Sequence, residues 1–224
     1  HFTYGKRELW YLNSIESKNM IATFVLGPRD DGKAANDELG GVSATDGMRK
    51  LERIDIYSKA EWIKTSGVKK PIKSIHFEYD YQLCTGTPDN GNANEGKLTL
   101  KSIYFTYNGN EKQFKNRYYF KYHSNPGYDR TANDRWGSYK PGTDNTLDGF
   151  SNLSNNDYPF SVQNKAKADQ NAGAWTLNEV TLPSGAKINV EYESDDYAYV
   201  QDRRAAQMFK IAGFGSSQSG TAVT

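Results

Sequence analysis

Residues 72–81 read Ile-Lys-Ser-Ile-His-Phe-Glu-Tyr-Asp-Tyr, and this stretch decides the fold. Ile72 is followed after two polar positions by Ile75, and from there apolar or aromatic residues alternate with polar ones up to Tyr81. Period two with β-branched and aromatic residues on one side is typical of a half-buried β-strand. The stretch therefore predicts a strand with one face toward a core.

The same pattern of Leu or Ile, two intervening residues, and Ile or Val returns along the chain, at 51–56, 100–105 and 177–182, with a shorter version at 12–15. Several copies run into alternation that ends in tyrosine, as at 118–122 and 188–192. Turn-forming residues separate the apolar runs at 17–19, 108–110 and 183–185. Such spacing indicates strand-turn-strand units, because Gly, Pro and Asn supply the dihedrals of tight turns.

We therefore predict an all-β fold of antiparallel hairpins, lying side by side in a curved sheet or partial shell. Gly, Asn, Asp, Ser and Pro are dense at 27–47, 84–96 and 124–173, which predicts long loops there. A short helix is expected near the C-terminus over 202–208, around Arg203, and a second short helix over 165–172. We expect one β-rich unit over 1–215 with a flexible tail over 216–224; the alternative is a split into 1–123 and 174–215.

Composition limits the function. The 28 Lys and Arg nearly balance the 27 Asp and Glu, for a net charge of +1, so we expect neither nucleic acid nor an anionic membrane as a partner. One cysteine, Cys84, excludes an internal disulfide, and with three histidines we expect no cofactor. No run reaches the length of a membrane helix. The first residue is His1, and we expect the chain to be a segment of a longer protein.

No sharp catalytic motif occurs, which favours binding or structure over catalysis. Glu191 and Glu193 are the most suggestive carboxylates, because they are expected on one strand face and paired carboxylates can hydrolyse glycosides. The alternative is a solvated face of that strand. We expect no enzyme, with a glycosidase as the least improbable one.

An aromatic and charged cluster in the 124–173 loop suggests a carbohydrate platform, because rings stack on the apolar faces of sugars. The candidate ligand-binding residues are Asp134, Arg135, Trp136, Tyr139 and Trp175. The alternative is that Trp136 anchors its long loop to the sheet.

Two Asp- and Asn-rich loops offer oxygen ligands of the kind that calcium takes. The candidate ligands are Asp89, Asp144 and Asp148, although neither loop has EF-hand spacing. Turn formation is the alternative explanation for both loops.

The hairpin units resemble those of the RHS and YD-repeat superfamily. The resemblance is carried by residues 9–15, by the recurring Leu-x-x-Ile strands that end in tyrosine, and by 182–192. The segments 97–103, 134–137 and 193–201 look like parts of large RHS-like secreted or surface proteins of Bacteroidota. The resemblance implies a β shell of hairpins that spiral side by side, in this superfamily often around a toxic payload.

From this resemblance we expect a non-enzymatic structural and interaction segment of an extracellular or cell-surface protein. Its partners would be neighbouring repeats of the same polypeptide, with surface glycans as a further partner. A carbohydrate-binding β domain is the alternative function, and a glycoside hydrolase the more distant one.

Overall fold

The computed structural model describes residues 4–64, 66–88, 90–92, 94–110, 116–134, 137–145, 164–195, 199–200 and 202–204. The chain divides into two compact units. One comprises 1–128 and 174–191, and the other comprises 129–173 and 192–224. The hairpin at 177–189 belongs to the same unit as the earlier hairpins, and the single unit over 1–215 stays a prediction.

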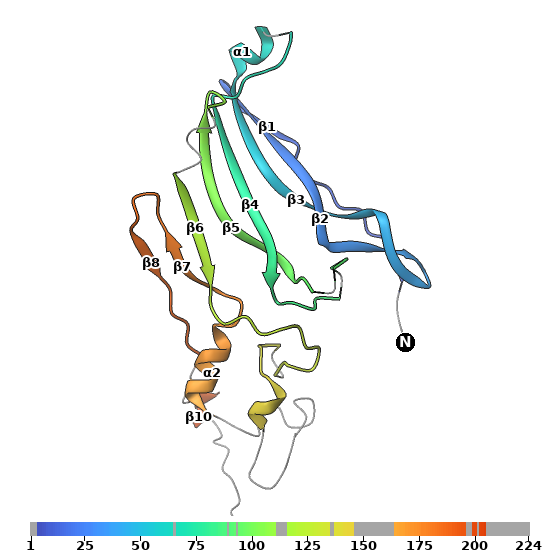
Figure 1. The fold of residues 1–224 in the computed structure, drawn as a ribbon, viewed down its shortest axis with the longest axis vertical. Coiled ribbons are helices and arrows are strands. Elements are labelled where there is room, and N and C mark those ends of the chain that lie inside the picture. The colour runs from blue at the N-terminus through green and yellow to red at the C-terminus, as the bar shows by residue number, and fades with distance from the viewer. Residues whose placement is uncertain are drawn as a thin grey trace, which may run out of the picture. The chain divides into compact units, whose positions relative to one another are not determined.

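The first unit holds an open sheet of eight strands in chain order, and every neighbouring pair is antiparallel (Figure 1). The predicted all-β fold is thereby confirmed. The turns predicted at 17–19 and 183–185 connect β1 to β2 and β7 to β8. The strands are β1 (Ser14–Glu16), β2 (Met20–Asp37), β3 (Gly40–Ser58), β4 (Lys73–Leu83), β5 (Lys97–Tyr107), β6 (Arg117–Tyr122), β7 (Leu177–Thr181) and β8 (Lys187–Asn189).

Helix is a minor component, as predicted. Helix α1 (Lys59–Lys64), which the sequence analysis missed, connects β3 to β4. In the second unit, α2 (Lys165–Ala172) confirms the helix expected at 165–172, and the Asn164 side chain caps it by accepting from the Lys167 backbone N–H. This unit also contains the 3₁₀ helix η2 (Gly142–Asn145). Within the described residues, no helix is long and apolar enough to cross a membrane.

The helix predicted over 202–208 is wrong at the three positions that the structure describes, where Asp202 lies in a turn with a φ of +63°. Arg203–Arg204 form β10, which pairs with β9 (Tyr199–Val200) in a separate two-stranded sheet. Good helix formers at these positions are overridden by strand pairing, because intrinsic propensity is a weak preference. Residues 205–208 lie outside the described residues, as does the tail predicted at 216–224.

The stretch 27–47 forms strands, where we predicted a loop. It makes up the distal half of the β2–β3 hairpin, in which the register shifts between Pro28 and Lys33 and again before Ala35. The hairpin closes between Asp37 and Gly40, and Gly40 has a φ of +100°. Turn-prone residues are accommodated here because the irregular ladder still pairs their backbone groups. The other two predicted loops are 84–96 and 124–173. Their described parts contain an isolated β-bridge but no strand, and their only regular elements are α2 and η2.

The Leu-x-x-Ile spacing has a structural explanation in β-bulges. In a regular strand, residues three apart lie on opposite faces. In β3, β5 and β7, however, the register with the preceding strand shifts by one after the leucine, so the next residue has no partner on that strand. A bulge residue of this kind rotates the strand and brings the leucine onto the face of the following Ile or Val. The three bulge residues are Glu52, Lys101 and Asn178.

A tyrosine accompanies each of the central bulges. Tyr79 on β4 pairs with Leu100 of β5, and its hydroxyl donates to the carbonyl of Leu51 on β3 (2.8 Å). Tyr122 on β6 occupies the equivalent position: it pairs with Leu177 and donates to the carbonyl of Leu100 (2.8 Å). The two hydroxyls therefore satisfy carbonyls next to the bulges in β3 and β5. In β4 and β6, a tyrosine of the alternation is thus part of the sheet's hydrogen bonding.

Tyr79→Phe is expected to lower the free energy of unfolding by about 1 kcal/mol, because the Leu51 carbonyl loses its donor while the ring is kept. Burial, and then the charge of Glu52, already raises the pKa of the Tyr79 phenol, so this hydroxyl is partly desolvated. Urea denaturation measures the effect. The matched control is Tyr107→Phe, on the exposed end of β5, which should leave stability unchanged within about 0.5 kcal/mol. Equal stability of Tyr79→Phe and wild type would contradict the role of this bond.

One face of the sheet, here called the apolar face, carries rows of large apolar side chains. Cross-strand pairing runs from Phe24 through Ile54 and Ile75 to Phe105 in one row. The remaining members come from the neighbouring rows: Phe77, Ile103, Tyr118, Phe120, Val180 and Ile188. Each of these ten side chains is at least partly exposed. Within the described residues of the first unit, the apolar face therefore has no layer that buries it fully.

Candidate functional site

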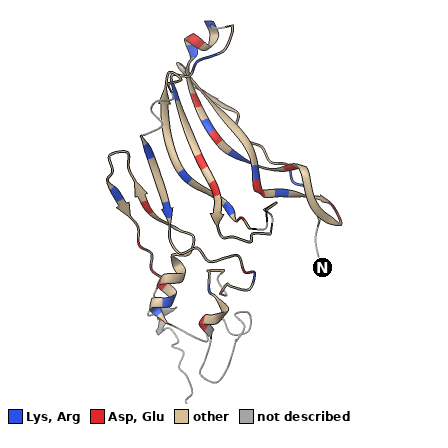
Figure 2. Ribbon diagram, in the orientation of Figure 1, with Lys and Arg blue, Asp and Glu red and all other residues tan. Residues whose placement is uncertain are grey.

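The opposite face of the sheet, here called the polar face, carries the residues with chemical potential. Register places Arg53 of β3 beside His76 of β4, then Tyr104 of β5, then Arg117 of β6. Figure 2 shows acidic and basic residues interspersed along the strands. The other members of the polar face are Asp55, Ser74, Glu78, Ser102, Thr106, Tyr119, Lys121, Glu179 and Thr181.

A cluster on β4, β5 and β6 is built around Glu78. The Ser102 hydroxyl donates to its carboxylate (2.5 Å), and Arg117 forms an ion pair with the same oxygen. The Arg117 guanidinium also lies 4.5 Å from the centre of the Tyr104 ring. Ser102, at the base of the cluster, is only 2% exposed. Glu78 is thus held in one orientation by partners on β5 and β6.

A second cluster lies on β3, β4 and β5. Asp55 accepts from Arg53 (2.9 Å) and from the Ser74 hydroxyl (2.6 Å), and it is buried. His76 stacks on Tyr104 with ring centres 4.5 Å apart and planes inclined by 4°, and its Nε2 shares a hydrogen bond with Thr106 (2.9 Å). These side chains lie side by side on the polar face, and the small residues among them, Ser74 and Thr106, are buried.

Two hollows open on the polar face. The larger, of about 450 Å³, has Tyr119 on its rim with 49% of that residue exposed, and is lined by Glu78, Lys101, Ser102, Tyr119, Phe120, Lys121 and Thr181. The smaller, of about 220 Å³, is lined by residues around Asp55 and His76. Each lining contains a single carboxylate, already bonded to an arginine and a serine. The larger hollow therefore places an exposed aromatic ring beside a carboxylate that already has two partners.

Beside the larger hollow, Glu179 on β7 lies between two lysines. Lys121 of β6 (2.8 Å) and Lys187 of β8 (3.1 Å) bond to its two oxygens. The hydrogen bond from Lys121, followed by that from Lys187, lowers the pKa of Glu179 to about 2. Glu179 is therefore ionised at neutral pH and serves as a fixed negative charge rather than as a proton donor.

The predicted carbohydrate platform is described only in part. Arg135 and Trp136 lie outside the described residues. Asp134 and Tyr139 belong to the second unit, where Asp134 accepts from the Ser138 backbone N–H (2.9 Å) and a β-bridge joins Asn133 to Tyr139. These contacts join the described residues 133–134 to residues 138–139.

Trp175 belongs to the first unit and has a structural role there. Its indole N–H donates to the carbonyl of Pro126 (2.8 Å), its backbone N–H donates to Ser124, and its φ is +58°. Lys97 lies 5.4 Å from the centre of its ring. Trp175 thus fastens the segment after β6 to the segment before β7, which is the anchoring role that we had weighed for Trp136.

The calcium prediction can be compared with the structure at Asp144 alone, because Asp89 and Asp148 lie outside the described residues. One carboxylate oxygen of Asp144 accepts from Lys167 (3.2 Å) and the other accepts from Asn171 (2.9 Å), both on α2. Within the described residues no group of three or more His, Cys, Asp or Glu side chains could hold a metal ion. Asp144 therefore fastens η2 to α2 in this structure.

Glu191 and Glu193 do not share a strand face, contrary to our prediction, because β8 ends at Asn189. Both are exposed, and neither lines the two hollows described above. Cys84 is a buried free thiol.

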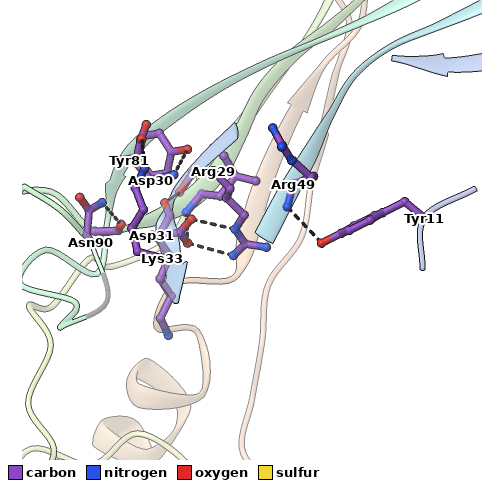
Figure 3. A network of polar contacts seen from close by, with 12 residues as sticks. Tyr11, Arg29, Asp30, Asp31, Lys33, Arg49, Tyr81 and Asn90 are labelled. Carbon is purple, nitrogen blue, oxygen red and sulfur yellow. Dashed lines mark hydrogen bonds and ion pairs between the residues drawn. The ribbon is translucent and has the colours of Figure 1, made fainter. Parts of the chain in front are cut away.

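The sequence analysis missed a buried polar network at the distal end of the β2–β3 hairpin (Figure 3). Arg29 donates twice to Asp31, at 2.7 and 2.9 Å, and the backbone N–H of Leu98 on β5 donates to the same carboxylate (2.8 Å). Alongside, the Tyr81 hydroxyl accepts from the Asp30 backbone N–H (3.0 Å). The alternation Arg-x-Asp at 29–31 could have indicated this ion pair on one face of a strand. The turn-rich composition of 27–47 favoured a loop instead.

Fold and site together define an all-β protein with an open antiparallel sheet, one polar face and one apolar face. Comparison with family models, with curated proteins and with solved structures finds no significant match to this chain. A functional proposal for it therefore rests on its own fold and surfaces.

Proposed function

We propose that this chain is a non-enzymatic structural and interaction segment of a large extracellular RHS-like β-shell protein. The observation that carries the proposal is the apolar face, on which ten large side chains in the middle of the sheet are left partly exposed. A sheet buries its apolar face against another layer, and a face this large on a lone domain is unusual. Neighbouring repeats of the same polypeptide would supply that layer, and an enclosed payload is a further role for such a shell.

Repetition within the sheet supports the same proposal. Two strand pairs, β3–β4 and β5–β6, carry the same bulged leucine and the same carbonyl-binding tyrosine. A unit that recurs in this way can extend a sheet, since each copy presents the same kind of edge to the next. Repeat architectures gain their stability from stacking such neighbours.

The test is binding of a hydrophobic dye, 8-anilinonaphthalene sulfonate, to the folded chain. Wild type is expected to bind the dye with a strong blue shift, and Phe105→Ser on the apolar face should lower the signal at least twofold. Tyr119→Ser, a matched aromatic loss on the polar face, should leave it unchanged. Circular dichroism confirms that each variant is folded. A folded wild type that binds no dye would overturn the proposal.

A second candidate function, a carbohydrate-binding β domain, is favoured by the hollow beside Tyr119. An exposed ring flanked by Glu78, Lys121 and Thr181 offers stacking and hydrogen bonds together. In the same experiment, soluble glycans replace the dye and intrinsic fluorescence is the readout. Saturable binding that Tyr119→Ser abolishes and Phe105→Ser preserves would support this candidate, and indifference to every glycan would remove it.

A further inference from the structure

From β3 to β7, two kinds of strand alternate in the sheet. Strands β3, β5 and β7 carry the bulged pattern of leucine, two residues, and Ile or Val. Strands β4 and β6 carry the tyrosine-ending alternation, which contains Tyr79 in β4 and Tyr122 in β6, and each is followed in the sheet by a bulged strand. Pairing is specific: the tyrosine lies opposite the leucine, and the apolar residue two before it lies opposite the Ile or Val.

The two edges of the sheet are of opposite kinds. β8 contains Ile188, the start of the third tyrosine-ending alternation at 188–192, and no described strand pairs with its outer side. β1 at the other edge contains Ile15 of the pattern Leu12-x-x-Ile15, and no described strand pairs with its outer side either. Because the two kinds alternate in the sheet, the strand that fits beside β8 is one of the β1 kind.

Strand direction agrees with this match. Eight strands in an antiparallel order leave β1 and β8 running in opposite directions. The β1 strand of a second copy, placed in the same orientation beside β8, is therefore antiparallel to it and continues the meander. Such a contact is head to tail, because one edge of each copy meets the other edge of the next.

Both edges offer backbone groups and apolar side chains. In β8 the hydrogen bonds to β7 are made by Ala186 and Val190, so the backbone groups of Asn189 point to the free side. In β1 the bonds to β2 are made by Asn13 and Ser17, so those of Ser14 point outward. The edges also expose the apolar side chains that their patterns contribute, namely Leu12 (55%), Ile15 (53%) and Ile188 (51%).

We infer that the free edge of β8 binds the β1 edge of a second copy of this chain, head to tail, through the pairing that joins tyrosine-ending strands to Leu-x-x-Ile strands within the sheet. The inference rests on the proposed function, in which the second copy stands in for the neighbouring repeat. Each edge strand is only three residues long, so the association is weak, with a dissociation constant of about 100 µM.

Sedimentation velocity on the full chain between about 10 and 500 µM tests the inference. Wild type is expected to form dimers and longer species as concentration rises. Asn189→Pro removes one outward N–H of β8, and Ser14→Pro removes one of β1, while the bonds to β7 and β2 are kept. Asn189→Pro keeps the β1 edge intact, and Ser14→Pro keeps the β8 edge intact. Because a solution of either variant alone lacks the complementary edge, each should remain monomeric. An equimolar mixture should form a dimer that grows no further.

Three results would overturn the inference: a wild type that stays monomeric throughout, proline variants that associate as wild type does, or a mixture that stays monomeric while wild type associates. The outcome is separable from that of the proposed function. Dye binding to the apolar face with a monomeric wild type would reject the edge pairing alone. Absence of dye binding would reject the structural role, whatever the state of association.

Discussion

Asp31→Ala is expected to lower the free energy of unfolding by about 3 kcal/mol. The carboxylate is 2% exposed and accepts two bonds from Arg29 and one from the Leu98 backbone N–H. Its removal leaves a partly buried guanidinium and a strand amide without their acceptor, and breaking a buried ion pair in this way is strongly destabilising. Urea denaturation at pH 7 measures the loss.

The neighbouring residue provides the control. Asp30 is half exposed and lies 3.7 Å from Lys33, so Asp30→Ala should change stability by no more than about 0.5 kcal/mol. If Asp30→Ala and Asp31→Ala cost the same, the network around Arg29 would have no special weight in stability.

The same carboxylate predicts a dependence on pH. Burial raises the pKa of Asp31, but the hydrogen bonds from Arg29 and from the Leu98 N–H together outweigh burial and bring it below its ordinary value of 3.8. The folded state then binds this proton less tightly than the unfolded state. Its contribution is complete above about pH 5 and is lost as the pH falls through the folded pKa. The stability difference between wild type and Asp31→Asn should therefore shrink on acidification below about pH 4.

Gly96→Ala is expected to cost about 3 kcal/mol or more, because a Cβ at this position would overlap the carbonyl oxygens of Leu83 and Cys84. These are backbone atoms, which cannot move aside as a flexible side chain can. Gly96 is also bonded on both sides: its N–H donates to Tyr81 and its carbonyl accepts from Asn90 (2.8 Å). Thermal and urea denaturation would both report the loss.

Gly91→Ala in the same loop is the matched control. No atom lies within 4 Å of a Cβ built there, so the variant should be within about 0.5 kcal/mol of wild type, or slightly more stable. Full stability of Gly96→Ala would mean that the loop at 84–96 can move away from the end of β4.

Much of the sheet could be predicted from local pattern. Alternation at 72–81 and 118–122 predicted β4 and β6, and turn residues at 183–185 predicted the β7–β8 hairpin, where Gly185 has a φ of +86°. The stretch 27–47 could not be predicted in this way. Its Gly- and Asp-rich composition favours turns, and the strands form there because partners across the hairpin and on β5 accept and donate its hydrogen bonds.

The candidate site was less predictable than the fold. Alternation already placed His76 and Glu78 on one side of their strand, but the residues that bond them, Thr106 and Arg117, lie 30 and 39 positions away. Sequence reasoning instead chose an aromatic loop and two acidic loops, of which Trp175 and Asp144 prove to have anchoring contacts. Composition indicates which residues are conspicuous, whereas cross-strand register determines which of them meet.

The sequence by itself determined that this protein is built of antiparallel hairpins and that its strands have one apolar side, since period-two alternation and turn chemistry are local properties of the chain. Tertiary structure alone decided that Leu-x-x-Ile marks a bulge in β3, β5 and β7, and that Tyr79 and Tyr122 bond to carbonyls of Leu51 and Leu100. These features depend on register between strands, which is fixed by contacts between residues far apart in the chain.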